Sequence, residues 1–388
     1  MFVKKKLSLI LILAVLLLNI NVYADIGIED NLRSYILADS ETGKILESYN
    51  IDEIVEIASI SKIMTYAVVM DHVIKGDISL DDMIRIDADT ARIKGSTFDL
   101  KEGEEFKVEE LLEASLVVSG NDATYALAKY VAGSEAGFAE LMNAKAGEIG
   151  LENAVFYNST GLPIYPEDVQ NKMTTRELFE LANYIINSYP DVIEITKLKA
   201  IGMADRDFFH WNSNPLIPKI KEVDGLKTGF TNKAGYCHVA TFTKKAKKGQ
   251  ADDLRLIAIV MGAKNLNERN KMGETLVKYG LDNYSNKVFL DSEVPISKLY
   301  FENGKVQEIN IYPSTNYSEL VKEDEDIEIE VDLKDKTTLP LKRDQVVGSV
   351  RIVEDGKTVY ESDVLVKESL KKANIFVRFG RKIKSIFN

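Results

Sequence analysis

A serine and a lysine three residues apart open a long apolar stretch of the chain, in the segment Ser59-Ile60-Ser61-Lys62. Three residues is nearly one helical turn, so the side chains of Ser59 and Lys62 share one face of a helix. A serine hydroxyl needs a base to become a nucleophile. A lysine is such a base only when its amine is neutral, and burial or nearby positive charge lowers a lysine pKa by up to about 3–5 units. The pair indicates nucleophilic catalysis, although a helix N-cap is the better explanation of Ser59 taken alone.

A second polar group, Ser119-Gly120-Asn121, lies between two predicted helices. At such a junction the Ser119 hydroxyl can relay a proton to a leaving amine, and the Asn121 amide can hold a substrate carbonyl. The same three residues also make an ordinary helix–helix turn with a capping asparagine.

A third group, Lys227-Thr228-Gly229, is predicted on an edge strand. Lys227 supplies a positive field that binds a substrate carboxylate and lowers the pKa of Lys62, and Thr228 can donate a hydrogen bond to that carboxylate. Gly229 lets a substrate backbone lie against the strand. The backbone N–H groups of Ser59 and Phe230 suit a developing oxyanion. A solvated lysine at the end of a strand is the plainer alternative.

The order and spacing of the three groups are more specific than any one of them. Ser-x-Asn follows Ser-x-x-Lys by 60 residues, and Lys-Thr-Gly comes about 106 residues later. This trio occurs in penicillin-binding proteins and class A β-lactamases. Chance matches at Ser314 and Ser369 lie after Lys227 and cannot satisfy the order.

The elements that must position these groups form strands first, then helices, then strands again. Hydrophobic patterns predict a helix over 57–74 that carries the serine and the lysine. The other predicted helices cover 107–118, 121–132, 135–148, 174–188 and 265–284, and the predicted strands cover 33–39, 44–49, 226–229, 236–243 and 254–262. This order indicates an α+β fold with one antiparallel sheet and helices beside it.

The texture of the sequence changes after about residue 286. Short alternating runs separated by turn residues such as Asn303-Gly304 predict a small all-β domain. Residues 369–388 carry six basic residues and no acidic one, and they predict an amphipathic helix in a membrane interface. The apolar face would hold Ile375, Phe376, Phe379, Ile383, Ile386 and Phe387. Packing of this helix on the β domain is the alternative.

The N-terminal segment has the pattern of an export signal. Lys4, Lys5 and Lys6 precede the apolar run 7–18, and Val22-Tyr23-Ala24 resembles a cleavage site. An uncleaved anchor is the alternative. The chain then divides into four predicted parts, which are a signal peptide 1–24, a catalytic domain 25–286, a β domain 287–367 and a membrane-associating helix 368–388.

Composition excludes several classes of function. The 388-residue chain has 49 basic and 61 acidic residues, and this acidic balance argues against nucleic-acid binding. One cysteine, Cys237, leaves no internal disulfide, and its expected role is buried packing. The three histidines show no zinc spacing, so we expect no metal and no cofactor.

The sequence resembles the low-molecular-mass penicillin-binding proteins that act as serine D-alanyl-D-alanine carboxypeptidases. The resemblance spans residues 33 to about 284, and the trailing β domain and tail fit the family layout. It is carried by the segments 57–65, 118–123, 158–162, 211–216, 224–231 and 233–236. Phe230 departs from members that carry histidine there, and Gly120 departs from the aspartate common in class A β-lactamases, which favours the peptidase.

The resemblance implies a mechanism and a partner. Lys62 would take the proton of Ser59 as its hydroxyl attacks the penultimate D-alanine carbonyl of a peptidoglycan stem pentapeptide. Ser119 would pass a proton to the departing D-alanine, whose carboxylate lies on Lys227 and Thr228. Water would then hydrolyse the ester. β-Lactams would acylate Ser59 and leave slowly, and removal of the terminal D-alanine would limit cross-linking.

Three rival functions remain open at this point. A β-lactamase would release penicillin rapidly, and a D,D-endopeptidase would cut cross-links. A silent wall-binding protein would keep the fold without the reaction, which the four intact polar side chains of the motifs argue against. The expected location is outside the cytoplasm, peripheral on the outer face of the cytoplasmic membrane.

Overall fold

The computed structural model describes residues 26–335 and 337–384. The predicted signal peptide 1–24 and the last apolar residues of the tail, Ile386 and Phe387, lie outside the described residues. The chain divides into two compact units. The first contains the residues up to Thr243 together with Arg255–Lys278, and the second contains Lys244–Leu254 together with the residues from Tyr279 onward.

An antiparallel five-stranded sheet forms the centre of the first unit, with the strand order β2-β1-β11-β10-β9. Strand β9 lies at one edge, as predicted for the Lys-Thr-Gly segment. The strands are β1 (Ser34–Asp39), β2 (Ile45–Tyr49), β9 (Val223–Thr231), β10 (Gly235–Lys244) and β11 (Leu254–Ala263).

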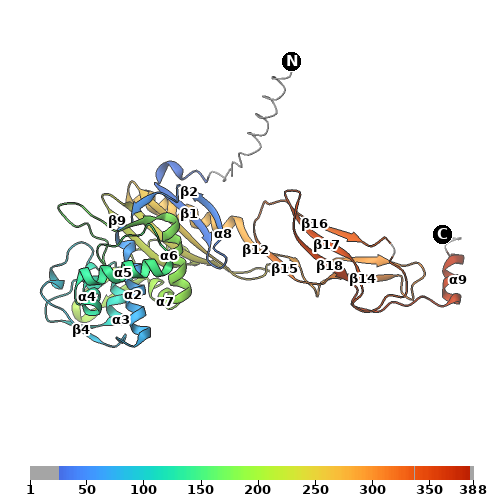
Figure 1. Ribbon diagram of the computed structural model, residues 1–388, viewed down its shortest axis with the longest axis horizontal. Coiled ribbons are helices and arrows are strands. Elements are labelled where there is room, and N and C mark those ends of the chain that lie inside the picture. Colours follow the sequence, from blue (N-terminus) through green and yellow to red (C-terminus); the bar gives the residue numbers. More distant parts are fainter. Residues whose placement is uncertain (1–25, 336, 385–388) are drawn as a thin grey trace, which may run out of the picture. The chain divides into compact units, whose positions relative to one another are not determined.

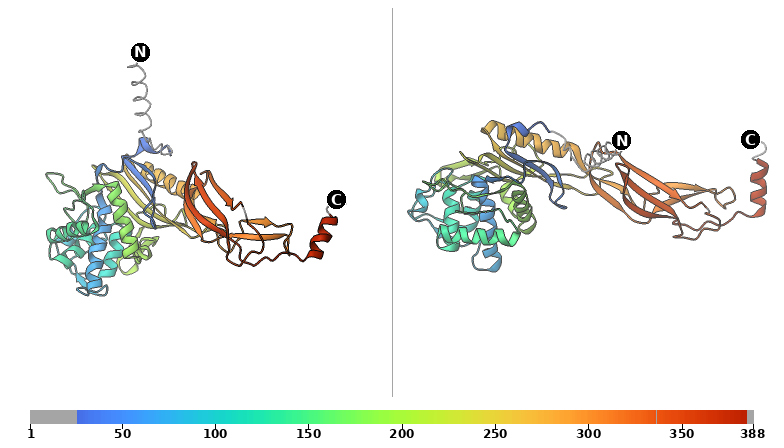
Figure 2. Two further views of the ribbon diagram at one scale, coloured as in Figure 1. Left: turned by 45° about the vertical axis from the view of Figure 1, so that its right-hand side comes forward. Right: turned by 45° about the horizontal axis from the view of Figure 1, so that its top comes forward.

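Helices cover both faces of this sheet. Figures 1 and 2 show the group α2 to α7 on one side, while α8 (Leu266–Asn283) lies along the other side. The members of the larger group are α2 (Lys62–Lys75), α3 (Val108–Val117), α4 (Asn121–Ala132), α5 (Glu135–Ile149), α6 (Thr175–Ser188) and α7 (Val192–Thr196).

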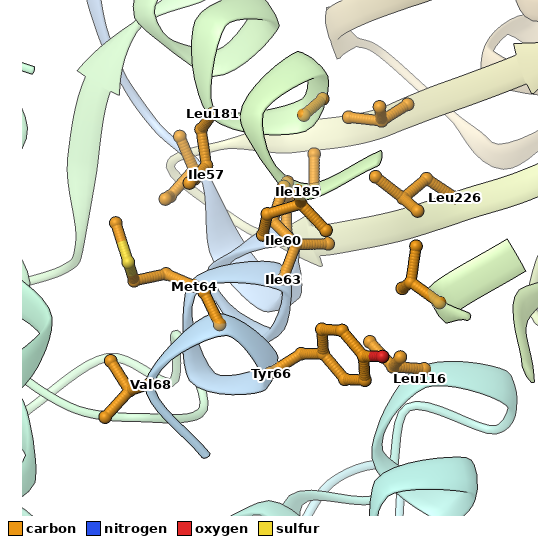
Figure 3. Packing of buried hydrophobic residues seen from close by; sticks show 14 of the residues in the cluster. Ile57, Ile60, Ile63, Met64, Tyr66, Val68, Leu116, Leu181, Ile185 and Leu226 are labelled. Atoms are coloured by element: carbon orange, nitrogen blue, oxygen red, sulfur yellow. The ribbon is translucent and has the colours of Figure 1, made fainter. Parts of the chain in front are cut away.

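The core of the first unit surrounds helix α2. Its residues 62–69 are all buried, because it packs against several other elements at once. Leu181 and Ile185 of α6 and Leu226 of β9 lie around Ile60 and Ile63, and Leu116 of α3 lies beside Tyr66, as Figure 3 shows. This packing fixes the start of α2, which carries the predicted catalytic pair, between the helices and the edge of the sheet.

Short two-stranded pairs and 3₁₀ turns connect the larger elements. They were not predicted, since three- or four-residue strands show too little alternation to be recognised. The pairs join β3 (Ile54–Glu56) to β6 (Lys172–Thr174), β4 (Met83–Arg85) to β5 (Glu105–Lys107), and β7 (Ala200–Met203) to β8 (Phe208–Trp211). The 3₁₀ turns are η1 (Glu29–Asn31), η2 (Ala58–Ser61), η3 (Thr90–Arg92) and η4 (Ala204–Arg206).

The second unit is built from strands, as the sequence predicts. Its larger sheet has the order β13-β14-β18-β17-β16, and β12 pairs with β15 in a smaller one. The core contains Ile311, Val350, Ile352 and Val364. The elements are β12 (Tyr284–Leu290), β13 (Ser297–Tyr300), β14 (Glu308–Pro313), β15 (Tyr317–Lys322), β16 (Ile327–Leu333), β17 (Val346–Glu354), β18 (Lys357–Leu365) and α9 (Ile375–Lys384).

Three local expectations differ from the structure. The first long helix starts at Lys62 and not at residue 57, because Ala58 adopts a left-handed φ of 49° that a helix cannot contain. Strand β15 was missed because its buried residues, Leu320 and Val321, are adjacent and do not alternate. The last helix starts at Ile375 and not at residue 369, because Leu370 forms a β-bridge with Leu341 and so has an extended backbone.

The α+β class and the antiparallel sheet flanked by helices are confirmed. The main helices begin and end within a few residues of their predicted bounds. No helix within the described ranges has the length and apolar character needed to cross a membrane.

Candidate active site

The predicted nucleophile lies on a tight turn directly before a buried helix. Ser59 belongs to η2 and Lys62 is the first residue of α2. The Nζ atom of Lys62 lies 2.9 Å from Oγ of Ser59, 2.8 Å from Oδ1 of Asn121 and 2.9 Å from the carbonyl oxygen of Thr160. Ser59 is half-buried, whereas Lys62 is completely buried. Solvent therefore reaches the hydroxyl but not the amine beneath it.

The three neighbours of the Lys62 amine suit its neutral form. The Asn121 side chain donates from Nδ2 to the carbonyl of Lys94 at 2.8 Å, which turns its Oδ1 towards Lys62. That Oδ1 and the Thr160 carbonyl can only accept hydrogen bonds. A neutral amine has two N–H donors for these acceptors and one lone pair, which is left for the Ser59 hydroxyl to donate to. This arrangement suits a general base beside a nucleophile.

Burial is the main cause of the low basicity of Lys62. It lowers the pKa of Lys62 to about 7, while the negative charges of Asp122 and Glu135 act in the opposite direction. Lys227 is equally buried, and its pKa lies well below the usual value because of burial, then the charge of Lys62, then that of Arg269. The two predicted amines therefore lie close enough to repel each other. The charge of Lys62 lowers the pKa of Lys227, whereas the shift of the Lys62 pKa is accounted for by burial and the two acids, without the predicted contribution of Lys227.

The second predicted group lies between α3 and α4, and its Asn121 contacts Lys62. Ser119 is 6% exposed and has a left-handed φ of 62°. Such conformations are uncommon for residues other than glycine and concentrate at functional sites. Asn121 begins α4, and its backbone N–H donates to the carbonyl of Ser96 at 2.8 Å. A Cβ atom on Gly95 would lie 2.7 Å from Nδ2 of Asn121, so this loop approaches as closely as it does only with glycine there.

Asp122 holds that loop against the start of α4. Its Oδ1 accepts from the backbone N–H of Phe98 at 2.8 Å, and its Oδ2 accepts from that of Leu100 at 3.0 Å. Asp122 is 2% exposed. Both oxygens are therefore committed to the loop, and the side chain fixes the position of the neighbouring Asn121.

Strand β9 brings the third predicted group against the segment that carries Ser59. Lys227 is 1% exposed, and its Nζ donates to the carbonyl of Thr228 at 2.9 Å. A Cβ atom on Gly229 would lie 3.2 Å from the backbone nitrogen of Ser59. The glycine thus allows β9 to pass beside η2, and it places the backbone of Phe230 next to that of Ser59.

The side chains of Thr228 and Phe230 border this strand. Thr228 donates from Oγ1 to the carbonyl of Ser213 at 3.4 Å, a long hydrogen bond that a better acceptor can replace. The ring of Phe230 is 48% exposed and stacks on Tyr236 with 4.1 Å between ring centres. All eight predicted site residues, Ser59, Lys62, Ser119, Asn121, Lys227, Thr228, Gly229 and Phe230, lie on these three segments.

The segment 158–162, which carries part of the family resemblance, forms a turn beside Lys62. The segment Asn158–Leu162 provides the Thr160 carbonyl described above. A Cβ atom on Gly161 would lie 1.9 Å from the carbonyl oxygen of Ala58, so the turn packs directly on the nucleophile segment. The polar sequence Asn158-Ser159-Thr160-Gly161 predicts a turn, but nothing in it predicts which helix the turn contacts.

Two residues behind β9 were also missed. His238 on β10 is buried, and neither ring nitrogen has a hydrogen-bond partner in the described part of the chain. Burial, with the charges of Arg269 and Lys227, lowers the pKa of His238 to about 3, so its ring is neutral. Arg269 on α8 is 6% exposed and is one cause of the low pKa of Lys227. His238 lies on the next predicted strand after the Lys-Thr-Gly strand, whereas nothing in the sequence predicts that Arg269 lies near Lys227.

Comparison with known proteins adds independent findings. Residues 26–265 match the family model described as D-alanyl-D-alanine carboxypeptidase, and residues 284–372 match that of the penicillin-binding protein 5 C-terminal domain. The chain is 34% identical over 355 residues to the D-alanyl-D-alanine carboxypeptidase DacF of Bacillus subtilis, covering 89% of this chain and 87% of DacF. It is 31% identical over 363 residues to DacC of Escherichia coli, covering 89% and 86%.

Solved structures agree with these similarities. The crystal structure of penicillin-binding protein 5 from Haemophilus influenzae superposes with a TM-score of 0.63 and 26% sequence identity. That match covers 88% of this chain and 98% of the other. Both the sequence and the fold therefore resemble the same group of proteins over nearly the whole of their length.

Proposed function

Because the chain belongs to the D-alanyl-D-alanine carboxypeptidase family, we propose that Ser59, Lys62 and Ser119 are its catalytic residues. The protein is a serine-type D-Ala-D-Ala carboxypeptidase, a hydrolase that removes the terminal D-alanine from peptidoglycan stem peptides. β-Lactams, which resemble that dipeptide, bind in the same site.

Acylation starts with proton transfer between the two residues at the start of α2. Lys62 accepts the proton of the Ser59 hydroxyl, and the Ser59 oxygen attacks the carbonyl carbon of the penultimate D-alanine. The negative charge that develops on the carbonyl oxygen is held by the backbone N–H groups of Ser59 and Phe230. The closeness of Gly229 to the Ser59 nitrogen supports this pairing of donors.

The leaving D-alanine lies between Ser119 and strand β9. The Ser119 hydroxyl gives its proton to the amine as the peptide bond breaks, and it recovers a proton from Lys62. The substrate carboxylate lies against Lys227 and Thr228, and the Asn121 amide holds the substrate backbone beside Gly229. Water then attacks the ester on Ser59, which releases the shortened peptide and restores the hydroxyl.

One observation carries this assignment of roles. The fully buried amine of Lys62 contacts two groups that can only accept hydrogen bonds and one hydroxyl that can donate. Among residues 26–335 and 337–384, no carboxylate forms an ion pair with it. A helix cap or a structural ion pair would not need a buried, uncompensated lysine, because that arrangement costs stability.

Mass spectrometry after treatment with penicillin tests the assignment. Wild type should gain one penicilloyl group on Ser59 and should release D-alanine from a pentapeptide that ends in D-Ala-D-Ala. Ser59→Ala should lose both properties. Ser369→Ala is a matched control, because Ser369 begins a chance Ser-x-x-Lys match and lies on the second unit, and it should keep both.

The same assays separate the rival functions. Rapid destruction of penicillin without an accumulated adduct would favour a β-lactamase. Cleavage of cross-linked dimers without release of terminal D-alanine would favour an endopeptidase. An adduct on another residue would overturn the role of Ser59, and no adduct with no hydrolysis would leave a silent wall-binding protein.

We also propose that the chain acts outside the cytoplasm, on the outer face of the membrane, after removal of residues 1–24. Residues 25–286 would be the catalytic domain and 287–367 the small β domain. The substrate is part of the cell wall, which supports this location.

Helix α9 supports attachment to the membrane surface. Its residues Phe376 and Phe379 are 83% and 67% exposed. On the other side, Arg378 donates to Oδ1 of Asn303 at 3.2 Å, and Arg381 donates to the carbonyl of Gly304 at 2.7 Å. The arginines thus hold the helix to the second unit while the aromatic side chains stay free to enter a lipid interface.

Co-sedimentation with vesicles of anionic phospholipid tests this attachment. Wild type should sediment with the vesicles, and the double variant Phe376→Ser with Phe379→Ser should stay largely in solution. Val359→Ser removes an exposed apolar side chain from β18, outside the helix, and should behave as wild type. Equal sedimentation of all three proteins would reject the proposal.

A further inference from the structure

The turn 158–161 is bound to α2 at two neighbouring carbonyl groups. The hydroxyl of Thr65 donates to the carbonyl of Ser159 at 2.7 Å, and the amine of Lys62 donates to the carbonyl of Thr160 at 2.9 Å. The close packing of Gly161 on Ala58 adds a third contact. The position of the Lys62 amine therefore depends on where this turn is held.

Glu135, the first residue of α5, holds the turn from its other side. Its Oε1 accepts hydrogen bonds from the backbone N–H of Ser159 at 2.6 Å and from the Ser159 hydroxyl at 2.8 Å. Its second oxygen, Oε2, is buried and receives no hydrogen bond from any residue that the structure describes. The start of a helix favours a negative charge, so the carboxylate suits its place on α5. A chain of contacts thus runs from Glu135 through Ser159 and Thr160 to Lys62.

The charges around Lys62 come from three elements. Asp122 on α4 and Glu135 on α5 are negative, and Lys227 on β9 is positive or neutral, with Arg269 and the neutral His238 behind it. Burial raises the pKa of Glu135, while the two donors of Ser159 and the charge of Lys62 act to lower it. Neither acid forms an ion pair with Lys62, so each affects the amine through space.

Resting on the proposed function, we propose that Glu135 is a positioning residue for acylation. It fixes the turn whose Thr160 carbonyl holds Lys62, and its charge sets how readily Lys62 accepts the proton of Ser59. The carboxylate acts through the turn and through its field, and it touches neither the substrate nor the Ser59 hydroxyl.

Glu135→Gln separates the effect of the negative charge from that of the hydrogen bonds to Ser159. The glutamine keeps an Oε1 acceptor for both Ser159 donors but has no negative charge. Because the charge of Glu135 favours protonated Lys62, its removal should lower the pKa of Lys62. The pH at which the acylation rate reaches half of its plateau, the midpoint, should fall by less than about 1 unit. The rate on the plateau should fall slightly, because a weaker base accepts the proton less readily.

The measurement is the rate at which a chromogenic cephalosporin acylates the full chain between pH 5 and 10. Glu140→Gln is a matched control, since Glu140 lies exposed on the same helix and should change neither midpoint nor plateau. Ser159→Ala removes one donor and leaves the charge, so it should lower the plateau and leave the midpoint in place. Thermal unfolding of each variant establishes that it is folded.

The outcomes distinguish this inference from the function on which it rests. If wild type forms no adduct on Ser59, the proposed function fails. If wild type is acylated and Glu135→Gln has the same midpoint and plateau, or a midpoint at higher pH, the role of Glu135 is wrong. If Ser159→Ala moves the midpoint as far as Glu135→Gln does, the charge of Glu135 is not what sets it.

Discussion

Helix α2 carries one buried lysine, Lys62, and helix α5 carries another, Lys145. The two differ in whether a carboxylate contacts the amine. Lys145 of α5 contacts the carboxylate of Asp71 on α2 at 2.7 Å and lies over the ring of Tyr184. Burial by itself lowers the pKa of Lys145, but the hydrogen bonds with Asp71 and Tyr184 outweigh it and leave the pKa raised. Lys62 of α2 has no such partner, and its pKa is lowered to about 7.

The difference is one of direct contact. Both regions contain a carboxylate, since Asp71 accompanies Lys145 and Glu135 accompanies Lys62. Asp71 contacts its lysine directly, whereas Glu135 binds Ser159 and reaches Lys62 only through Ser159 and Thr160. Removing one partner of a buried ion pair costs stability, whereas an unpaired buried lysine is available as a base. The four predictions below test this contrast.

The largest expected effect is on catalysis at Lys62. Lys62→Met keeps most of the length of the side chain but removes the base, so acylation of Ser59 by a β-lactam should slow by about 10²–10⁴-fold. Stopped-flow acylation at pH 8 measures this rate. Lys145→Met is the control and should be acylated nearly as fast as wild type. A similar loss in both variants would mean that Lys62 has only a structural role.

The backbone beside Lys62 can be tested through Gly161, which packs against the segment that carries Ser59. Gly161→Ala would place a Cβ atom 1.9 Å from the Ala58 carbonyl and displace the turn above Lys62. A displacement of about 1 Å at a catalytic site can reduce the rate by about 10²-fold, and acylation assays should show a loss of that order.

Gly150 is the matched control for Gly161, because it ends α5 near Lys145. It has a φ of 94°, but a Cβ atom there would meet open space. Gly150→Ala should therefore cost about 1–2 kcal/mol of stability from backbone strain alone and should leave acylation unchanged. Equal acylation by the two variants would show that the turn does not position the catalytic pair.

The effect of Lys145 should appear in stability. Lys145→Met leaves the carboxylate of Asp71 without its cationic partner, so the free energy of unfolding should fall by about 1–3 kcal/mol. Urea unfolding measures the change. Lys129→Met removes the more exposed pair with Asp87 and should cost about 0–1 kcal/mol. If Lys145→Met is as stable as wild type, the contact between Lys145 and Asp71 does not contribute to stability.

The three sequence motifs predicted which segments the structure brings together better than they predicted the contacts between them. The spacing of Ser59 and Lys62 within one turn, and the order of the three motifs, led to side chains that the structure brings together. Hydrophobic periodicity also predicted the long helices, because α2 and α6 each bury a broad apolar face. These features are local, and local patterns can be read directly from a sequence.

Contacts between distant segments could not be predicted in the same way. Glu135 and Ser159 are 24 residues apart, and Lys62 and Thr160 are 98 residues apart. The left-handed conformation of Ala58, which starts the helix at Lys62, depends on packing against the turn at Gly161. Without tertiary packing, a glutamate at the start of a helix predicts only a favourable interaction with the helix dipole.

The pH dependence of acylation tests the central claim most directly. The claim is that Lys62 loses its proton near neutral pH because it is buried without an acidic partner. The rate of Ser59 acylation by a β-lactam should therefore rise with pH through a midpoint near 7, where the pKa of Lys62 lies. A midpoint near 10, the ordinary range of lysine, or a rate that does not change between pH 5 and 9, would contradict it.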